Sequence, residues 1–369
     1  MNRPFLCTIV LGFLTFPIVL NSQSNYKIPK PITKDYNQIS VGVFPQVELI
    51  SIVQTIGKYP TVLGFLMAKD TSTYRTEVIN HFNFHKNHPA VLMFNRLSLQ
   101  PRMLNFSAPS NIMLYTNDSL GLRTDIELDD FVINRAGGID SLRFFLRLLS
   151  DFAVQSAFNK FFEDHSDFYL TIAENTIKNM GSFNFISELE NFYGKTQNSY
   201  NIILVTLYSS VGFGNSLLYS NEKRDIYNTL GPKTVLNYVP FFGDENSLKY
   251  MIRHEFSHPF VNPLTEKYWN FIKDYSQYYD SIPPVARKNV CGDWQECINE
   301  FIIRAVTTQI AYNESVSVGS QVYSKELASG VSYLDELMDK IKLFESRRDT
   351  FLTFESFYPN ILDVFKKHE

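Results

Sequence analysis

The sequence predicts an α+β fold that is mostly helical, with a small mixed or antiparallel sheet late in the chain. Apolar residues recur at helical spacing through the first half. Short runs of branched and aromatic residues then gather between Tyr200 and Phe242, and helical spacing returns from Leu248 onward. Because helices and strands are segregated along the chain, the pattern differs from that of an alternating β-α-β fold.

The first half is expected to contain four helices. Each is bounded by a residue that commonly starts or stops a helix: Gly57 ends the first, Pro89 follows the second, Asp140 caps the third and Gly181 follows the fourth. The predicted helices cover residues 47–56, 73–88, 141–162 and 167–180.

Three strands are predicted where the pattern changes. They are "YNIILVTLYSS" (residues 200–210), "NSLLYS" (215–220) and "KTVLNYVPFF" (233–242). Gly212 and Gly214 are expected to interrupt the first strand. Their stretch "GFGNS" lacks the lysine of a phosphate-binding P-loop.

The C-terminal part is expected to be helical again. A helix begins near Leu248, with Asp244 or Asn246 as its cap, and a second begins at Asp293. The last helical stretch covers residues 327–367. The small sheet is therefore expected next to the helix that begins near Leu248.

The first 24 residues are predicted to be a secretory signal peptide. Arg3 precedes an apolar run over residues 5–20, and small polar residues follow. Pro17 interrupts the run, which is shorter than the ~20 apolar residues of a membrane-spanning helix, although an uncleaved anchor is the alternative.

Residues 25–369 show no repeat and no linker and are expected to form a single domain. We expect an exported protein, periplasmic or secreted, with no stable membrane span after cleavage.

Charge and cysteine content narrow the class of protein further. The formal net charge is −4, so the chain lacks the basic surface that nucleic-acid binding requires. After removal of the signal peptide only Cys291 and Cys297 remain. Export allows this pair to form a disulfide, and two buried thiols are the alternative.

The stretch "LKYMIRHEFSHPFVNP" carries the sharpest functional signal. His254 and His258 are four residues apart, so on a helix they share one face and can bind one zinc ion. Glu255 lies beside them and can take a proton from a zinc-bound water, whose pKa the metal lowers toward ~7. Apolar neighbours such as Met251 and Phe256 argue against two exposed surface histidines.

Pro259 directly follows the second histidine. Proline has no N–H, and its ring crowds the carbonyl group of Glu255. We expect the helix to kink or end there. The site needs only the turn before the proline, so the proline is expected to shorten the helix without abolishing the site.

A catalytic zinc ion usually has a third protein ligand. No third histidine follows at the required spacing, which leaves the carboxylates of Glu266, Glu296 and Glu300. Glu266 is expected to be a surface charge, and Glu296 is explained by a capping box with Asp293. Glu300 lies in the middle of an apolar helix and is the preferred ligand, with Arg304, four residues on, as its competing partner.

These motifs resemble the gluzincins, which are zinc metallopeptidases with two histidine ligands and one glutamate ligand. More narrowly, the chain resembles a bacterial family known as domain of unknown function 4932. That resemblance rests on "FPQVELISIVQTIG", "HPAV", "FNKFFEDHSDFY", "LENFYG", "HEFSHPFVNP", "NEFIIRAV" and "FESFYPNIL". It implies a zincin-like catalytic domain with His254, His258 and Glu300 as Zn²⁺ ligands and Glu255 as general base. Arg304 stands where thermolysin-like enzymes have an aspartate.

In such enzymes a strand pairs with an extended substrate, and a tyrosine or histidine often donates to the oxyanion. The strand "NIILVTLY" is the candidate for the first role. Tyr312, Tyr323 and Tyr333 are candidates for the second, with Tyr333 preferred.

A second histidine cluster is a weaker candidate for a metal site. His81, His85 and His88 share one helical face in "HFNFHKNH", without an accompanying glutamate.

From these observations we expect an exported zinc metallopeptidase that acts on a peptide or protein substrate. The alternative is a zinc-containing binding or scaffold protein with a vestigial hydrolase site. A third hypothesis is a zinc hydrolase that acts on a non-peptide amide.

Overall fold

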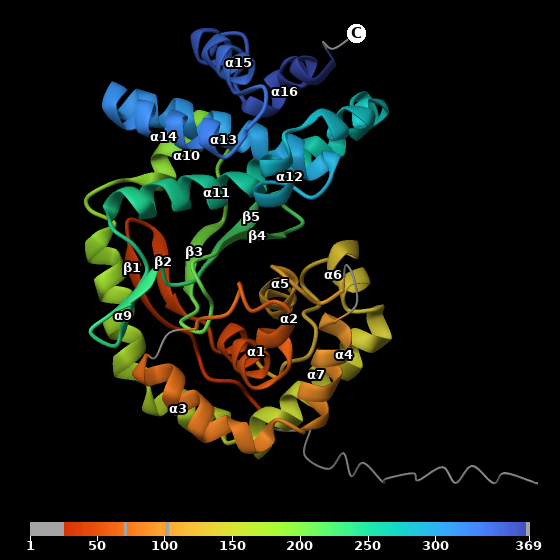
Figure 1. The fold of residues 1–369 in the computed structure, drawn as a ribbon, viewed down its shortest axis with the longest axis vertical. Helices are drawn as coiled ribbons and strands as arrows, with labels where there is room; N and C mark the ends of the chain where they lie inside the picture. The colour runs from red at the N-terminus through yellow and green to blue at the C-terminus, as the bar shows by residue number, and fades with distance from the viewer. Residues whose placement is uncertain (1–25, 70–71, 100–102, 367–369) are drawn as a thin grey trace, which may run out of the picture.

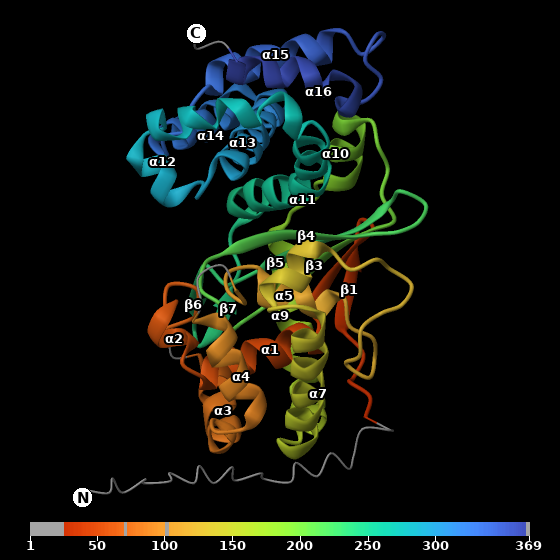
Figure 2. The same ribbon diagram turned by 90° about the vertical axis from the view of Figure 1, so that its right-hand side faces the viewer.

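The structure is a computed structural model that describes residues 26–69, 72–99 and 103–366. The expected signal peptide, residues 1–24, lies outside the described residues. The sheet lies between an N-terminal group of helices and a C-terminal layer of helices (Figure 1, Figure 2). No helix in the described ranges is long and apolar enough to cross a membrane.

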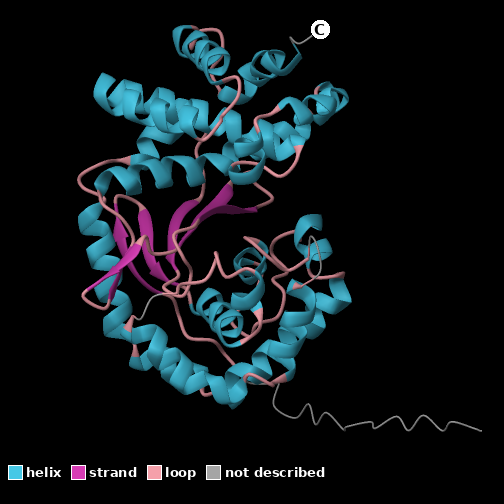
Figure 3. Cartoon of the chain, viewed as in Figure 1, coloured by secondary structure: helices cyan, strands magenta, loops and turns pink. Residues whose placement is uncertain are grey.

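Helices make up most of the fold, and strands occupy its centre (Figure 3). The α+β prediction is therefore confirmed. The helices before the central strands are α1 (Pro45–Ile56), α2 (Tyr59–Val62), α3 (Thr73–Phe82), α4 (Pro89–Ser98), α5 (Ala108–Leu114), α6 (Asp130–Arg135), α7 (Ile139–Gln155), α8 (Phe158–Asp164), α9 (Ser166–Asn179) and α10 (Phe185–Tyr193). Those after them are α11 (Glu245–Lys267), α12 (Pro284–Asn289), α13 (Trp294–Glu314), α14 (Val316–Ala328), α15 (Leu334–Ser346) and α16 (Phe354–Leu362).

The central sheet is mixed. Its strands are β1 (Ile32–Tyr36), β2 (Ile39–Val43), β3 (Ser199–Leu204), β4 (Gly212–Leu218) and β5 (Arg224–Leu230). They follow the order β1-β2-β3-β5-β4. Strands β2, β3 and β5 are parallel, whereas β1 and β4 pair antiparallel at the two edges. The prediction of a small mixed sheet beside the helix with the histidines is confirmed.

Several strands differ from the predictions. The first hairpin, β1–β2, was not expected because its outer strand is polar; Asn37 and Gln38 form its turn with positive φ values of 45° and 67°. Strand β5 was also missed, because polar residues such as Arg224 and Asn228 break its apolar pattern. The stretch predicted as one strand over residues 233–242 forms a separate hairpin of β6 (Thr234–Leu236) and β7 (Val239–Phe241).

Two long helices, α11 and α13, lie side by side above the sheet (Figure 1). Asp244 caps α11, because its carboxylate accepts a hydrogen bond from the Ser247 amide at 2.9 Å. Asp293 caps α13 by accepting from the Glu296 amide, also at 2.9 Å. These caps fix where each helix begins and therefore which side chains face the other helix.

Candidate metal centre

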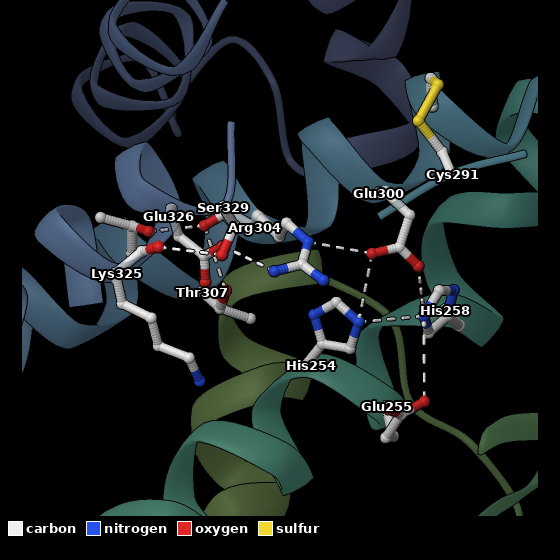
Figure 4. Close-up of polar contacts among 12 residues, drawn as sticks. His254, Glu255, His258, Cys291, Glu300, Arg304, Thr307, Lys325, Glu326 and Ser329 are labelled. Carbon is white, nitrogen blue, oxygen red and sulfur yellow. Dashed lines mark hydrogen bonds and ion pairs between the residues drawn. A yellow bond between two sulfur atoms is a disulfide. The ribbon is translucent and has the colours of Figure 1, made fainter. Parts of the chain in front are cut away.

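The two histidines of α11 and one glutamate of α13 point toward one another (Figure 4). The Nε2 atoms of His254 and His258 are 3.3 Å apart. The Glu300 carboxylate approaches both, with Oε2 at 3.5 Å from His254 Nε2 and Oε1 at 3.5 Å from His258 Nε2. One ligand atom from each residue lies within 4.8 Å of the others, and this is the one such group of three among the described residues.

The separations fit a tetrahedral zinc ion. Two ligands that each lie ~2.1 Å from zinc are about 3.4 Å apart in tetrahedral geometry. The observed separations of 3.3 and 3.5 Å match that value and are longer than ordinary hydrogen bonds. The ring of His254 is buried, with Nδ1 unpartnered among the described atoms, while His258 Nδ1 lies 3.3 Å from Asn262 Oδ1. The residues therefore fit the metal that the motif implies.

The helix does not end at Pro259. Helix α11 continues through Pro259 and Pro263 to Lys267, so the prediction that the proline shortens the helix was wrong. Proline removes one backbone hydrogen bond, but α11 is packed between the sheet and α13, which holds the remaining turns in helical conformation. The Glu255 carbonyl group, which the proline leaves without a helical donor, faces strand β4.

Glu255 lies on the side of α11 that faces β4. Its carboxylate is buried, and Oε2 is 3.9 Å from His258 Nε2. Burial raises the pKa of the Glu255 carboxyl to about 7, although the neighbouring His258 and a backbone hydrogen bond from Gly214 oppose the rise. Glu255 is thus next to the convergent ligand atoms without being one of the three.

Two glycines allow β4 to approach this turn. A Cβ atom on Gly212 would lie 2.6 Å from Glu255 Oε1, and one on Gly214 would lie 2.3 Å from the Glu255 carbonyl oxygen. Gly214 would also approach the Cβ atom of His258 to 3.1 Å. These glycines were expected to interrupt a strand, but they belong to one. Their role was not recognised because close approach to a distant helix leaves no local pattern beyond glycine itself.

Strand β4 is one of the two edge strands of the sheet, and β1 is the other. "NIILVTLY" was the candidate for substrate pairing, but its strand β3 is paired on both sides, by β2 and β5. Its backbone groups are therefore already used in the sheet, and that prediction was wrong. Strand β4 pairs with β5 on one side only among the described strands, and it lies directly against α11.

A network of hydrogen bonds holds the Glu300 carboxylate on the side away from the histidines. Arg304 Nε donates to Glu300 Oε2 at 3.0 Å, and its Nη1 donates to Glu326 Oε2 at 2.6 Å (Figure 4). Tyr250 donates to the other oxygen of Glu326 at 2.5 Å, and its ring stacks on His254 with the centroids 6.0 Å apart. Arg304 thus holds the Glu300 carboxylate while the histidines remain its neighbours.

Glu326 and Tyr250 were not singled out from the sequence. Glu326 is fully buried at the end of α14, and Lys325 places its Nζ 3.2 Å from the centre of the Tyr250 ring. The pairing of Glu326 with Arg304 joins residues 22 positions apart on different helices. No spacing rule connects them, so the sequence carries no signal for this contact.

The other carboxylates considered as ligands lie elsewhere. Glu296 accepts a hydrogen bond from the Gly292 amide at 2.8 Å, and its backbone closes the cap with Asp293. Glu266 is exposed on the last turns of α11. Neither joins the group of three ligand atoms. The structure thus brings Glu300, and not these two, to the histidines.

The three candidate tyrosines have other surroundings. Tyr323 donates to Asp335 at 2.7 Å. Tyr333 packs its ring against Phe301 and Phe365, with centroids 6.3 and 5.5 Å away. The ring of Tyr312 lies against Gly319. The tyrosine that contacts a ligand histidine is Tyr250, which precedes the motif.

The second histidine cluster does not converge. His81 Nε2 lies 2.8 Å from the carbonyl oxygen of Ser156, and His88 lies 3.3 Å from Asp151. The helix that was expected to hold all three histidines ends at Phe82. They therefore do not share one helical face.

Cys291 and Cys297 form a disulfide. Their Cα atoms are 4.9 Å apart, and the bond ties the segment before α13 to its first turns. Of the two alternatives left open by the sequence, a disulfide and two buried thiols, the structure has the disulfide. Glu300 lies one turn further along the same helix.

Comparison with known proteins yields a family but no described function. Residues 39–364 match the model of a family described as Domain of unknown function (DUF4932). No curated protein and no solved structure matches the chain. Because the match covers most of the sequence, the chain belongs to the DUF4932 family.

Proposed function

We propose that this protein is an exported, gluzincin-type zinc metallopeptidase that hydrolyses peptide bonds. The observation that carries the proposal is the convergence of His254, His258 and Glu300, with Glu255 buried beside them. A scaffold needs the three ligands alone, whereas a hydrolase also needs a base at the position of Glu255.

Each residue has a separate role in this proposal. Bound zinc supplies a Lewis acid that polarises the substrate carbonyl and acidifies a water molecule. His254, His258 and Glu300 hold the metal. Glu255 would take the proton of the attacking water and deliver it to the amine leaving group, since its carboxylate lies beside the ligand group next to β4.

The free edge of β4 offers a place for the substrate backbone. An extended peptide can add to a sheet edge through main-chain hydrogen bonds. Gly212 and Gly214 bring this edge against Glu255 and His258, so a peptide on β4 passes the ligand group. This arrangement favours an extended polypeptide substrate over a compact small molecule.

Export is part of the proposal. The disulfide of Cys291 and Cys297 supports it, because such bonds persist in oxidising compartments. We propose that residues 1–24 are removed as a signal peptide. N-terminal sequencing of protein from the native host tests this, and a retained Met1 in the mature protein contradicts it.

Metal content and hydrolysis, measured on wild type and on Glu255→Gln, test the function. We expect one zinc ion per chain in both proteins, and cleavage of a mixed peptide library by the wild type alone. Glu266→Gln, an exposed carboxylate on the same helix, is the matched control and should retain activity. Zinc binding without cleavage of any peptide would contradict the peptidase proposal, and absence of zinc would contradict the metal site.

A further inference from the structure

Arg224 is a half-buried arginine on β5, the strand next to the edge strand β4. It begins β5 and pairs with Leu218 of β4. Its side chain reaches β4, where Nη1 donates to the hydroxyl oxygen of Ser216 at 2.9 Å. The guanidinium therefore lies on β4, an edge strand of the sheet.

The charge of Arg224 has no carboxylate in contact among the described residues. Its side-chain hydrogen bond goes to a neutral hydroxyl group, and it forms no ion pair among the described residues. Asp129, Glu266 and Tyr115 act on it only through longer-range electrostatics, and burial lowers its pKa. Arg253 and Arg304 differ, since each forms ion pairs with glutamate. No nitrogen of Arg224 is both buried and unpartnered among the described residues, so its remaining donors are accessible to a ligand.

Arg224 also lies on the same face of β4 as the candidate metal centre. Gly212, Gly214 and Ser216 alternate along the strand, and the first two face α11. A Cβ atom on Gly214 would lie 3.1 Å from the Cβ of His258. Ser216 follows two residues later, which is about 7 Å along the strand. The hydrogen bond to Ser216 therefore places the guanidinium about two strand residues from the ligand histidine.

We propose that Arg224 binds a carboxylate of the peptide substrate, about two residues from the bond that is cleaved. This inference rests on the proposed function and assigns a substrate class to it. Guanidinium groups bind carboxylates through two parallel hydrogen bonds, and Arg224 has the donors to do so. Alternate side chains of an extended peptide point to the same face, so an acidic side chain or the C-terminal carboxylate of a peptide on β4 can reach it.

Matched peptides test this assignment. Each peptide is made in four forms, with Glu or Gln near the cleaved bond and with a free or amidated C-terminus. We expect the wild type to favour the carboxylate-bearing form by about 10- to 100-fold in kcat/KM, mainly through KM. Arg224→Gln should abolish that preference, because kcat/KM falls for the carboxylate-bearing peptide far more than for the neutral peptide. Whether the preference follows Glu or the free terminus identifies the source of the carboxylate.

A control variant and a binding readout separate specificity from folding. Arg123→Gln is the control, because Arg123 already binds Asp125 and Tyr219 near the same hairpin. It should retain the preference. In the E255Q background, calorimetry should show the same discrimination as a difference in Kd.

Three outcomes are distinguishable. Cleavage without any preference in the wild type overturns the role of Arg224 alone. An equal loss for charged and neutral peptides in Arg224→Gln also overturns it and assigns the residue a structural role. A wild type that neither binds nor cleaves any of the peptides overturns the proposed function, and this inference with it.

Discussion

Arg304 donates a 3.0 Å hydrogen bond to Glu300 and, through a second nitrogen, a 2.6 Å hydrogen bond to Glu326. Because Glu326 is fully buried, Arg304 is anchored on the side away from the histidines. The anchored guanidinium fixes the orientation of the Glu300 carboxylate. Residues that orient metal ligands in this way typically change metal affinity by about 10- to 100-fold when mutated.

Arg304→Gln should therefore weaken zinc binding by about 10- to 100-fold. Competition with a chromophoric chelator measures the affinity directly and does not depend on turnover. Lys249→Gln is the control, because Lys249 joins α11 to α13 through Glu314 without contacting a ligand residue. Equal affinity in wild type and Arg304→Gln would show that Glu300 needs no such support.

Glu300→Ala should weaken zinc binding far more than Glu296→Ala. Glu300 is the carboxylate within 3.5 Å of both histidine Nε2 atoms, whereas Glu296 accepts from the Gly292 amide. Loss of one of three protein ligands removes a direct metal bond, and loss of Glu296 removes only a capping contact. The same chelator competition compares the two variants, and the reverse order of affinities would overturn the ligand assignment.

Gly214→Ala should impair both stability and activity. The added Cβ would lie 2.3 Å from the Glu255 carbonyl oxygen, so β4 must move away from α11. Such overpacking costs about 1–3 kcal/mol in the free energy of unfolding. Gly121→Ala, where the new Cβ meets nothing closer than 3.4 Å, is the control. Urea unfolding measures the difference, and unchanged stability in Gly214→Ala would contradict the close approach of β4.

The pattern of the site could be predicted from the sequence because its parts are local. His254, Glu255 and His258 lie within one turn of helix, and Glu300 is the one charged residue between Cys297 and Ile303. The effect of Pro259 was misjudged, because local rules omit the packing that keeps α11 helical as far as Lys267.

Contacts between distant segments could not be predicted. Arg304 and Glu326 meet because α13 and α14 fold against each other. Strand β4 is an edge strand because β5 lies between it and β3, and the polar residues of β5 prevented its prediction. Edge position is a property of the whole sheet, so the pattern of "NIILVTLY" alone could not decide it.

Glu48 should make stability depend on pH. It is buried in α1, where Tyr74 donates to Oε1 at 2.6 Å, and burial raises its pKa from 4.5 to about 7. The folded state therefore keeps a proton that the unfolded state loses above pH 4.5. Stability falls as pH rises from 4.5 toward 7, by about 3 kcal/mol in total.

The variant Glu48→Gln isolates this contribution, because glutamine still offers an oxygen to Tyr74 but cannot ionise. Urea unfolding of both proteins between pH 4.5 and 8 gives the difference in free energy. We expect that difference to shift in favour of the variant by about 3 kcal/mol across this interval. A difference that stays constant with pH would show that Glu48 does not hold the raised pKa.

Anomalous diffraction at the zinc absorption edge tests the central claim most directly. Crystals of protein purified without chelators should show one strong anomalous peak, bound by Nε2 of His254, Nε2 of His258 and a carboxylate oxygen of Glu300. Glu255 should lie beside the metal without binding it. The absence of a peak at these residues in zinc-replete crystals, or a peak bound by other residues, would contradict the account.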